Sequence, residues 1–266
     1  MPRPLDVAAF TDEIADTLPD ALALAQAWGV TRVELREGST GRFPHFTAEE
    51  IGLLEGARRD GVRVTAVSPG IFKGSIADAA RLARELSDVL PRTLDLAARL
   101  GCRSVVAFGF ERTHGEPDAH RARVVDAFAR AAEAAHAAGM TVAVENEPGF
   151  WVDLPGASAA LVREVDHAAL GLNWDPANLH WGGVLPTYEG FRAVRPHLAG
   201  LHVKDFYPDD PAAPWRAVGD GITPWAEILR WIADETDLPH VTLETHTLPR
   251  TDASRRSLEW LRANVE

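Results

Sequence analysis

Eight short apolar segments with β propensity recur along the chain, and a helical pattern follows each one. The expected strands span residues 5–12, 32–36, 62–69, 103–110, 141–147, 171–175, 200–206 and 240–246. Apolar residues recur at the spacing of amphipathic helices in the stretches 20–29, 48–61, 79–101, 119–139, 157–165, 187–200, 224–236 and 252–265. Several of these helices end at a glycine shortly before the next strand, as helix C-caps do: Gly29, Gly61, Gly101 and Gly139.

This alternation of strands and helices favours one α/β fold over the others. Eight βα units in 266 residues match a (β/α)8 TIM barrel. A doubly wound open sheet is the competing fold, but the first strand-to-helix turn, TDEIADTLPD, lacks a glycine-rich phosphate-binding pattern. No Pro-, Ser- or Gly-rich linker divides the chain. We therefore predict a single barrel domain over residues 1–266.

Charge and cysteine content argue against several classes of protein. The net charge is −12, from 39 acidic and 27 basic residues, and no Lys/Arg-rich block offsets it, so we expect no nucleic-acid partner. Cys102 is the only cysteine, which excludes an internal disulfide and a cysteine metal cluster. No apolar run reaches the roughly 20 residues of a bilayer span, and MPRPLDVAAF lacks a signal-peptide pattern. We expect a soluble, cytoplasmic protein without a membrane partner.

Alternation within the last four expected strands predicts which side chains face the barrel interior. The outward positions are apolar: Val142, Val144, Leu172, Trp174, Leu201, Val203, Val241 and Leu243. The inward positions near the strand ends are mostly polar or ionisable: Glu145, Glu147, Asn173, Asp175, His202, Lys204, Thr242, Glu244 and His246. Active sites of (β/α)8 barrels form at the carboxyl ends of the strands. Four consecutive strands therefore direct ionisable groups into one mouth.

Three carboxylates and one imidazole meet in this mouth: Glu145, Asp175, Glu244 and His202. Carboxylates placed together repel each other unless they take up protons or share a cation. Oxygen and imidazole ligands of this kind suit Mn²⁺, Mg²⁺, Co²⁺ or Zn²⁺. Either glutamate alone would be more typical of a helix N-terminal cap. The matched phase of all four residues favours a divalent metal site instead.

The sequence also resembles the xylose isomerase-like barrels, a superfamily of sugar phosphate isomerases and epimerases that includes AP endonuclease 2 proteins. The matching stretches cover nearly the whole chain: TDEI at 11–14, VELR at 33–36, SPGIF at 68–72, VENEP at 144–148, NWDPAN at 173–178, HVKD at 202–205, GDG at 219–221 and LETH at 243–246. In the ketose epimerases of this family, a Glu, an Asp, a His and a second Glu from successive strands hold the metal. The resemblance places those ligands at Glu145, Asp175, His202 and Glu244.

The resemblance also implies that the two metal-bound glutamates, Glu145 and Glu244, are the catalytic acid/base pair. Proton removal beside a carbonyl creates an enediolate, whose charge a cation bridging two substrate oxygens neutralises. The sequence departs from the ketose epimerases at two substrate-binding positions, where Asn178 replaces a His and Pro208 replaces an Arg. HVKD is similar instead to a branch that includes inosose dehydratases, in which a Lys follows the metal His by two residues. Lys204 is then a candidate to polarise a carbonyl or hold an anionic group, and a role as counter-ion is equally open.

Further candidates for substrate contact surround the predicted metal site. They are Glu147 and His246, each one inward position beyond a proposed ligand, Asn178, and Trp181 in the loop after the sixth strand. Orientation of the metal ligands is an alternative role for Glu147 and His246, and ordinary packing is the alternative for Trp181. In the long loop after the seventh strand, Gly219 and Gly221 would let backbone amides approach a hydroxyl or phosphate oxygen. His114 would line the mouth or lie exposed in its loop.

We predict a divalent-metal-dependent isomerase or epimerase, with Mn²⁺ as the first choice of metal and a small sugar, sugar phosphate or keto-polyol as substrate. An inosose-type dehydratase on the same metal site is the alternative. An AP endonuclease-like repair enzyme fits poorly with the net charge of −12. A non-catalytic sugar-binding barrel fits poorly with four matched ligands. A homodimer is left open by the sequence.

Overall fold

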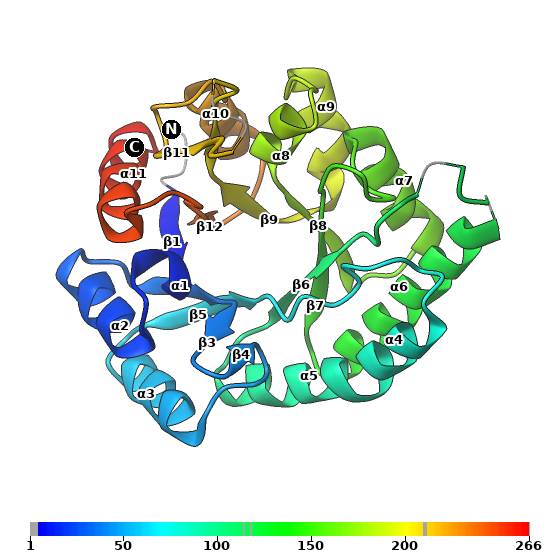
Figure 1. Cartoon of the computed structure of the whole chain (residues 1–266), viewed down its shortest axis with the longest axis horizontal. Coiled ribbons are helices and arrows are strands. Elements are labelled where there is room, and N and C mark those ends of the chain that lie inside the picture. The colour runs from blue at the N-terminus through cyan, green and yellow to red at the C-terminus, as the bar shows by residue number, and fades with distance from the viewer. Residues whose placement is uncertain (1–4, 114, 118, 210–211, 266) are drawn as a thin grey trace.

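The computed structural model describes residues 5–113, 115–117, 119–209 and 212–265. Within these residues eight parallel strands close into a barrel in the order β1-β12-β9-β8-β7-β6-β5-β2 (Figure 1). The strands are β1 (Asp6–Phe10), β2 (Arg32–Leu35), β5 (Arg63–Val67), β6 (Ser104–Phe108), β7 (Thr141–Glu145), β8 (Leu170–Trp174), β9 (Leu198–Val203) and β12 (His240–Leu243). The predicted (β/α)8 TIM barrel is confirmed.

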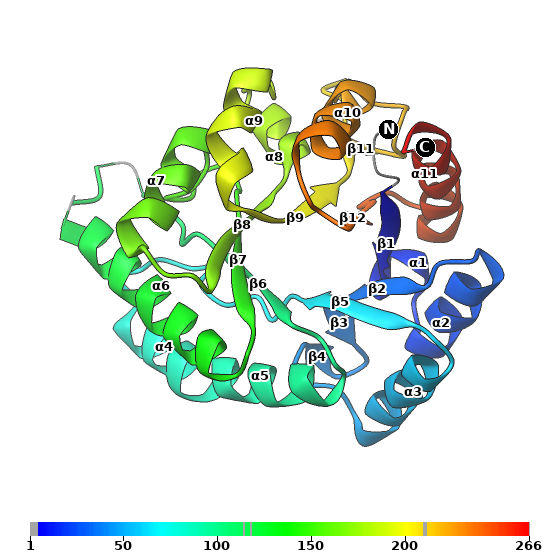
Figure 2. The same ribbon diagram turned by 180° about the vertical axis from the view of Figure 1, so that it is seen from behind.

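Helices form a ring around the strands (Figure 2). The longer ones are α2 (Leu18–Ala27), α3 (Ala48–Arg59), α5 (Leu90–Arg99), α6 (Ala119–Ala137), α7 (Pro155–Val165), α10 (Trp225–Glu235) and α11 (Arg250–Asn264). Shorter helices are α1 (Thr11–Ile14), α4 (Ala79–Arg84), α8 (Pro176–Trp181) and α9 (Tyr188–Val194). None of these helices combines the length and apolar character that crossing a bilayer requires.

All eight predicted strands are present, and each ends earlier than the sequence pattern indicates. Residues 11–12 belong to α1, and residues 146–147, 175 and 244–246 lie beyond the last ladder residue of their strands. Asp205 and Phe206 form a separate short strand, β10 (Asp205–Phe206), paired with β11 (Trp215–Arg216). A second hairpin joins β3 (Glu37–Gly38) to β4 (Gly41–Arg42). The polar residues that continue the inward alternation therefore stand on the rim of the barrel.

Prolines explain two helix boundaries that the apolar pattern misses. The stretch 79–101 is not one regular helix, because a π-helical turn (Glu85–Val89) separates α4 from α5. Pro91 has no N–H to donate four residues back and its ring crowds that carbonyl, which accounts for the wider turn. In the stretch 187–200, α9 ends at Val194, a 3₁₀ turn covers Arg195–His197 and β9 already begins at Leu198. Pro196 removes the amide that would continue the α-helix.

Pro176 begins a helix rather than simply ending a strand. It lies at the first position of α8, where its missing N–H costs nothing, and Asp175 is the N-cap. Trp181 is the last residue of this helix, so its predicted place in a loop is wrong. The four glycines predicted as helix ends, Gly29, Gly61, Gly101 and Gly139, all have positive φ angles, as C-cap positions require.

The strands are buried on both of their faces, as expected of a closed barrel surrounded by helices. Val142, Val144, Leu172 and Leu201 on the helix side are at most 2% exposed. Ladder register aligns Glu145 with Asn173, and His202 with Thr242, on the interior side. Below His202 the ring of Phe10 packs edge-on, with centroids 5.1 Å apart. The His202 imidazole is thus held in the barrel interior by an aromatic ring as well as by polar neighbours.

Candidate metal centre

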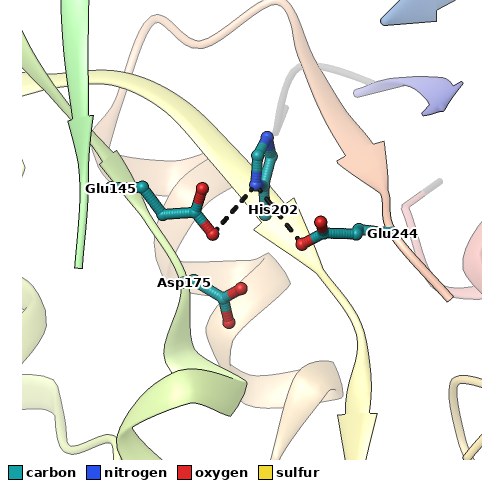
Figure 3. A group of neighbouring side chains, drawn as sticks. All are labelled: Glu145, Asp175, His202 and Glu244. Atoms are coloured by element: carbon teal, nitrogen blue, oxygen red, sulfur yellow. Dashed lines mark ion pairs between the residues drawn. The ribbon is translucent and has the colours of Figure 1, made fainter. Parts of the chain in front are cut away.

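Four side chains from consecutive strands meet at the floor of the barrel mouth: Glu145, Asp175, His202 and Glu244 (Figure 3). One ligand atom from each lies within 4.8 Å of all the others, and all four residues are buried. His202 Nδ1 lies 3.3 Å from Oε1 of Glu145 and 3.6 Å from Oε2 of Glu244. The residues predicted as metal ligands are therefore assembled in one cluster.

A buried glutamate from another strand orients the imidazole. Glu34 in β2 is 1% exposed, and its Oε1 lies 3.2 Å from Nε2 of His202. A proton on Nε2 that is donated to Glu34 leaves the lone pair of Nδ1 directed at Glu145 and Glu244. Nδ1 itself is buried without a hydrogen bond. This is the arrangement of metal-binding histidines, whose second nitrogen donates to a carboxylate.

Asp175 has two separate tasks, one for each carboxylate oxygen. Its Oδ1 accepts a hydrogen bond of 2.9 Å from the backbone amide of Asn178 and so caps α8. Its Oδ2 points into the cluster, 2.7 Å from Nζ of Lys204. Asn146 holds the backbone from the neighbouring strand, since its side chain bonds both the amide and the carbonyl of Asp175 at 2.7 and 2.8 Å. The cap fixes the direction of the carboxylate that faces the cluster.

Cations already surround the carboxylates of the cluster. Nζ of Lys204 also lies 3.0 Å from Oε2 of Glu244, and Arg36 Nη1 lies 2.6 Å from its Oε1. Burial raises the pKa of Asp175, and Lys204 offsets only part of that shift. Burial would also raise the pKa of Glu244, but Lys204, His246 and His202 more than reverse this and hold it well below its usual range. The geometry and charges of the four residues fit a divalent cation, which would share the negative charge of Asp175 that Lys204 leaves incompletely balanced.

A second layer of ion pairs ties Glu244 to the start of the chain. Arg36 contacts Asp12 at 2.6 Å and Glu13 at 2.5 Å as well as Glu244. His246 bridges the same carboxylates, with Nδ1 3.0 Å from Glu13 and Nε2 3.2 Å from Glu244. Burial lowers the pKa of His246, but Glu244 and Glu13 raise it overall to about 9. An orienting role for His246 at Glu244 is thereby supported by direct contact.

The cluster lies beneath a cavity of about 560 Å³. Every residue predicted to contact substrate lines it: Lys204, Glu147, Asn178, His246 and Trp181. Asn178 donates to the carbonyl of Asn146 at 2.8 Å and lies 3.5 Å from Oε1 of Glu145, while Glu147 lies 3.6 Å from Lys73. Trp181 is 47% exposed, and its ring packs edge-on against that of Trp215, with centroids 5.7 Å apart. These residues share one cavity with the two candidate catalytic glutamates.

The glycine pair of the loop after β9 has a different role from the one its sequence indicates. The amides of Gly219 and Gly221 donate to Oδ2 of Asp205 at 2.9 and 3.1 Å, so they are not directed toward a ligand. A Cβ at Gly221 would meet Oδ1 of Asp205 at 2.2 Å, which explains the glycine there. His114, the other loop residue considered, lies outside the described residues.

Sequence reasoning missed Glu34, Arg36, Asp12 and Glu13. Glu34 occupies the inward phase of β2, between the buried Val33 and Leu35, so the same alternation that identified Glu145 would have identified it. Asp12 and Glu13 lie in TDEI and Arg36 lies in VELR, and the pairing of Arg36 with Glu244 spans 208 residues of sequence. No local pattern reveals that pairing.

Comparison with known proteins places this barrel in a family. The family model of the xylose isomerase-like TIM barrel matches residues 22–264, and the chain therefore belongs to that family. No curated protein matches the chain by sequence.

Several solved structures share the fold at low sequence identity. The probable 3-DHS dehydratase AsbF from Bacillus anthracis is 18% identical, with a TM-score of 0.81 over 97% of this chain and 98% of that one. The IOLI protein with a bound zinc atom is 15% identical, with a TM-score of 0.83 over 98% of both chains. An L-ribulose 3-epimerase is 17% identical, with a TM-score of 0.81 over 98% of this chain and 94% of that one.

Proposed function

We propose that this protein is a divalent-metal-dependent isomerase or epimerase that moves a proton next to the carbonyl of a small sugar, sugar phosphate or keto-polyol. The observation that supports it most is the position of the Glu145 and Glu244 carboxylates on either side of His202, at the floor of an open cavity (Figure 3). Epimerisation requires a base and an acid on opposite faces of one carbon. Isomerisation requires proton transfer between adjacent carbons. Two flanking carboxylates serve either reaction.

In this proposal Glu145, Asp175, His202 and Glu244 hold the metal ion, with Mn²⁺ as the first choice and Mg²⁺, Co²⁺ or Zn²⁺ as alternatives. The bound cation supplies charge stabilisation for the enediolate oxygens. Glu145 and Glu244 remove and return the proton. Lys204, 4% exposed at its side chain, donates to a substrate oxygen at the cavity floor. Glu147, Asn178, His246 and Trp181 contact the substrate or orient these groups along the cavity wall.

A dehydratase of a keto-polyol is the second candidate, and Lys204 is the residue that favours it. Its ammonium lies 3.0 Å from Oε2 of Glu244, so an acid and a carboxylate base stand side by side. Such a pair suits removal of a proton by Glu244 and protonation of a departing β-hydroxyl by Lys204. The fold is also shared with the probable 3-DHS dehydratase.

Deuterium incorporation tests the proposal directly. Ketoses, keto-polyols and sugar phosphates are incubated with the Mn²⁺-loaded protein in D₂O, and exchange at the carbon next to the carbonyl is followed by NMR. Glu145→Gln and Glu244→Gln should each slow exchange by at least about a hundredfold, since general acid-base catalysis supplies that much. Glu133→Gln, on the exposed surface of α6, is the matched control and should exchange like wild type.

The outcomes separate the candidate functions. A dehydrated product identifies the dehydratase, and exchange without it identifies the isomerase or epimerase. Wild-type exchange in either glutamate variant would exclude the acid/base pair. Metal binding without exchange on any substrate would favour a non-catalytic sugar-binding barrel.

A further inference from the structure

The mouth of the barrel has a second half that supplies none of the candidate metal ligands. Arg42 enters the cavity from β4, Ser68 and Lys73 follow β5, and Phe108 ends β6. Both ribbon views place the β3–β4 hairpin beside β5, across the barrel from β8 and β9 (Figures 1 and 2). The metal-ligand candidates come from β7, β8, β9 and β12 or their ends. A substrate that reaches the metal cluster therefore extends toward this cationic wall.

The Arg42 guanidinium faces Glu37 across the β3–β4 hairpin, and that carboxylate acts on it only beyond ion-pair distance. Among the described residues Arg42 forms no ion pair, and its one side-chain hydrogen bond, from Nη2 to Oγ of Ser68, is long at 3.4 Å. Its Nε is buried with no hydrogen-bond partner. Arg36, six residues earlier, contacts three carboxylates. A largely buried cation with unused donors costs stability unless a ligand supplies the acceptor.

Lys73 adds a second cation to the same wall. Its Nζ lies 4.4 Å from the centre of the Phe108 ring, and Cζ of Arg42 lies 5.8 Å from the same centre. The nearest carboxylate to Lys73 is Glu147 at 3.6 Å, too far for a hydrogen bond, and the lysine side chain is 42% exposed. Their distances to this one ring centre bring the two charges within about 10 Å of each other, where like charges repel, and an anion bound by both would remove that repulsion.

We propose that Arg42, Lys73 and Ser68 form a subsite for an anionic group of the substrate, a phosphate or a carboxylate, at the end remote from the metal centre; this rests on the proposed function. Arg42 supplies the fork of N–H donors that matches either oxyanion, Lys73 supplies a second charge, and the Ser68 hydroxyl, buried at the end of β5, supplies a third donor. Lys204 and Arg36 are already paired with carboxylates. The subsite therefore favours acidic or phosphorylated keto-sugars over neutral ones.

Simple anions test this subsite without knowledge of the substrate. After EDTA treatment and dialysis, the full-length protein is titrated with inorganic phosphate and, separately, with acetate in a calorimeter. We expect saturable binding of at least one anion. Arg42→Met should weaken it about tenfold or more, because a charged hydrogen-bond donor is lost. Lys73→Met should weaken it about threefold, as expected for an exposed ion pair. Arg130→Met, on the exposed face of α6, should bind like wild type.

A second readout separates ligand binding from a structural role. Because no described carboxylate lies within ion-pair distance of Arg42, Arg42→Met should unfold at the same temperature as wild type or at a higher one. Preference for phosphate indicates a phosphorylated substrate, and preference for acetate a carboxylated one. Absence of saturable binding for both anions would overturn the subsite, as would wild-type affinity or a lowered unfolding temperature in Arg42→Met. If anions do not bind but substrates without an anionic group still exchange deuterium, the subsite is wrong and the proposed function stands. If anions bind but no substrate exchanges deuterium, the subsite stands and the proposed function is wrong.

Discussion

At the scale of single residues, Glu34 is the side chain that most directly prepares His202 for a metal. It accepts from Nε2 and so leaves Nδ1 free to coordinate. Glu34→Gln keeps the shape but removes the charge that favours this tautomer and strengthens the ligand. We expect Mn²⁺ affinity to fall by about tenfold or more, as it does when the partner of a metal-binding histidine is changed. Calorimetric titration of the metal-free protein measures this.

The matched control is Glu55→Gln, because Glu55 is exposed on α3 and pairs only with Arg99 among the described residues. Its Mn²⁺ affinity should equal that of wild type. Equal affinity in Glu34→Gln and wild type would mean that His202 is oriented by the fold alone, or that it does not bind the metal.

The direction of the site side chains can be predicted from the sequence, but their ion-pair partners cannot. Period-two alternation predicted the inward phase of Glu145, His202 and Glu244, because a strand that packs against helices has only one polar face. The alternation does not show which basic side chain pairs with which carboxylate. Arg36 meets Glu244 from 208 residues away, and Asp175 acquires its capping role from a helix that the sequence did not predict.

At the scale of elements, one carboxylate organises the loop after β9. Asp205 accepts backbone hydrogen bonds from Phe206, Gly219, Gly221 and Thr223, at distances between 2.9 and 3.1 Å. Asp205→Asn removes the charge and replaces one of the two acceptor oxygens by an NH₂ group, so two of these four bonds are lost and the other two are weakened. We expect amide hydrogen exchange in residues 207–209 and 212–223 to accelerate at least about tenfold, while the barrel strands stay protected. Exchange followed by mass spectrometry measures both regions in one experiment.

Asp220→Asn provides the comparison for that loop. Asp220 lies between the two glycines but is exposed and pairs with Arg256 on α11. Its exchange pattern should match wild type. If the Asp205 variant also matched wild type, the loop would be held by packing of Trp215 and Phe206, whose rings lie 6.0 Å apart, and not by the carboxylate.

The sequence predicts a strand or helix where the element is long enough to show a repeating apolar pattern. The eight strands and the helices between them recur with clear apolar patterns. Helix ends at Pro91 and Pro196 depend on a missing N–H, which the apolar spacing does not register. The hairpins β3–β4 and β10–β11 contain two residues per strand, too few for any alternation, although β4 carries Arg42 and β11 carries Trp215.

At the scale of the whole molecule, the seam between the last and first strands makes barrel stability depend on pH. His240 opens β12 opposite Asp6 of β1, and its Nδ1 is buried without a hydrogen bond. Burial, reinforced by the charge of Arg32, lowers the pKa of His240 from 6.5 to about 4. A depressed histidine pKa favours the neutral form in the folded state, so its contribution to stability is complete above pH 6.5 and is lost as the pH falls toward 4. Unfolding then takes up close to one proton at this site.

His240→Gln should therefore show a shallower fall in unfolding free energy than wild type between pH 6.5 and pH 4, measured by urea denaturation. Parallel pH profiles for the two proteins would place the acid sensitivity elsewhere, in the carboxylates of the mouth rather than at the seam that closes the barrel.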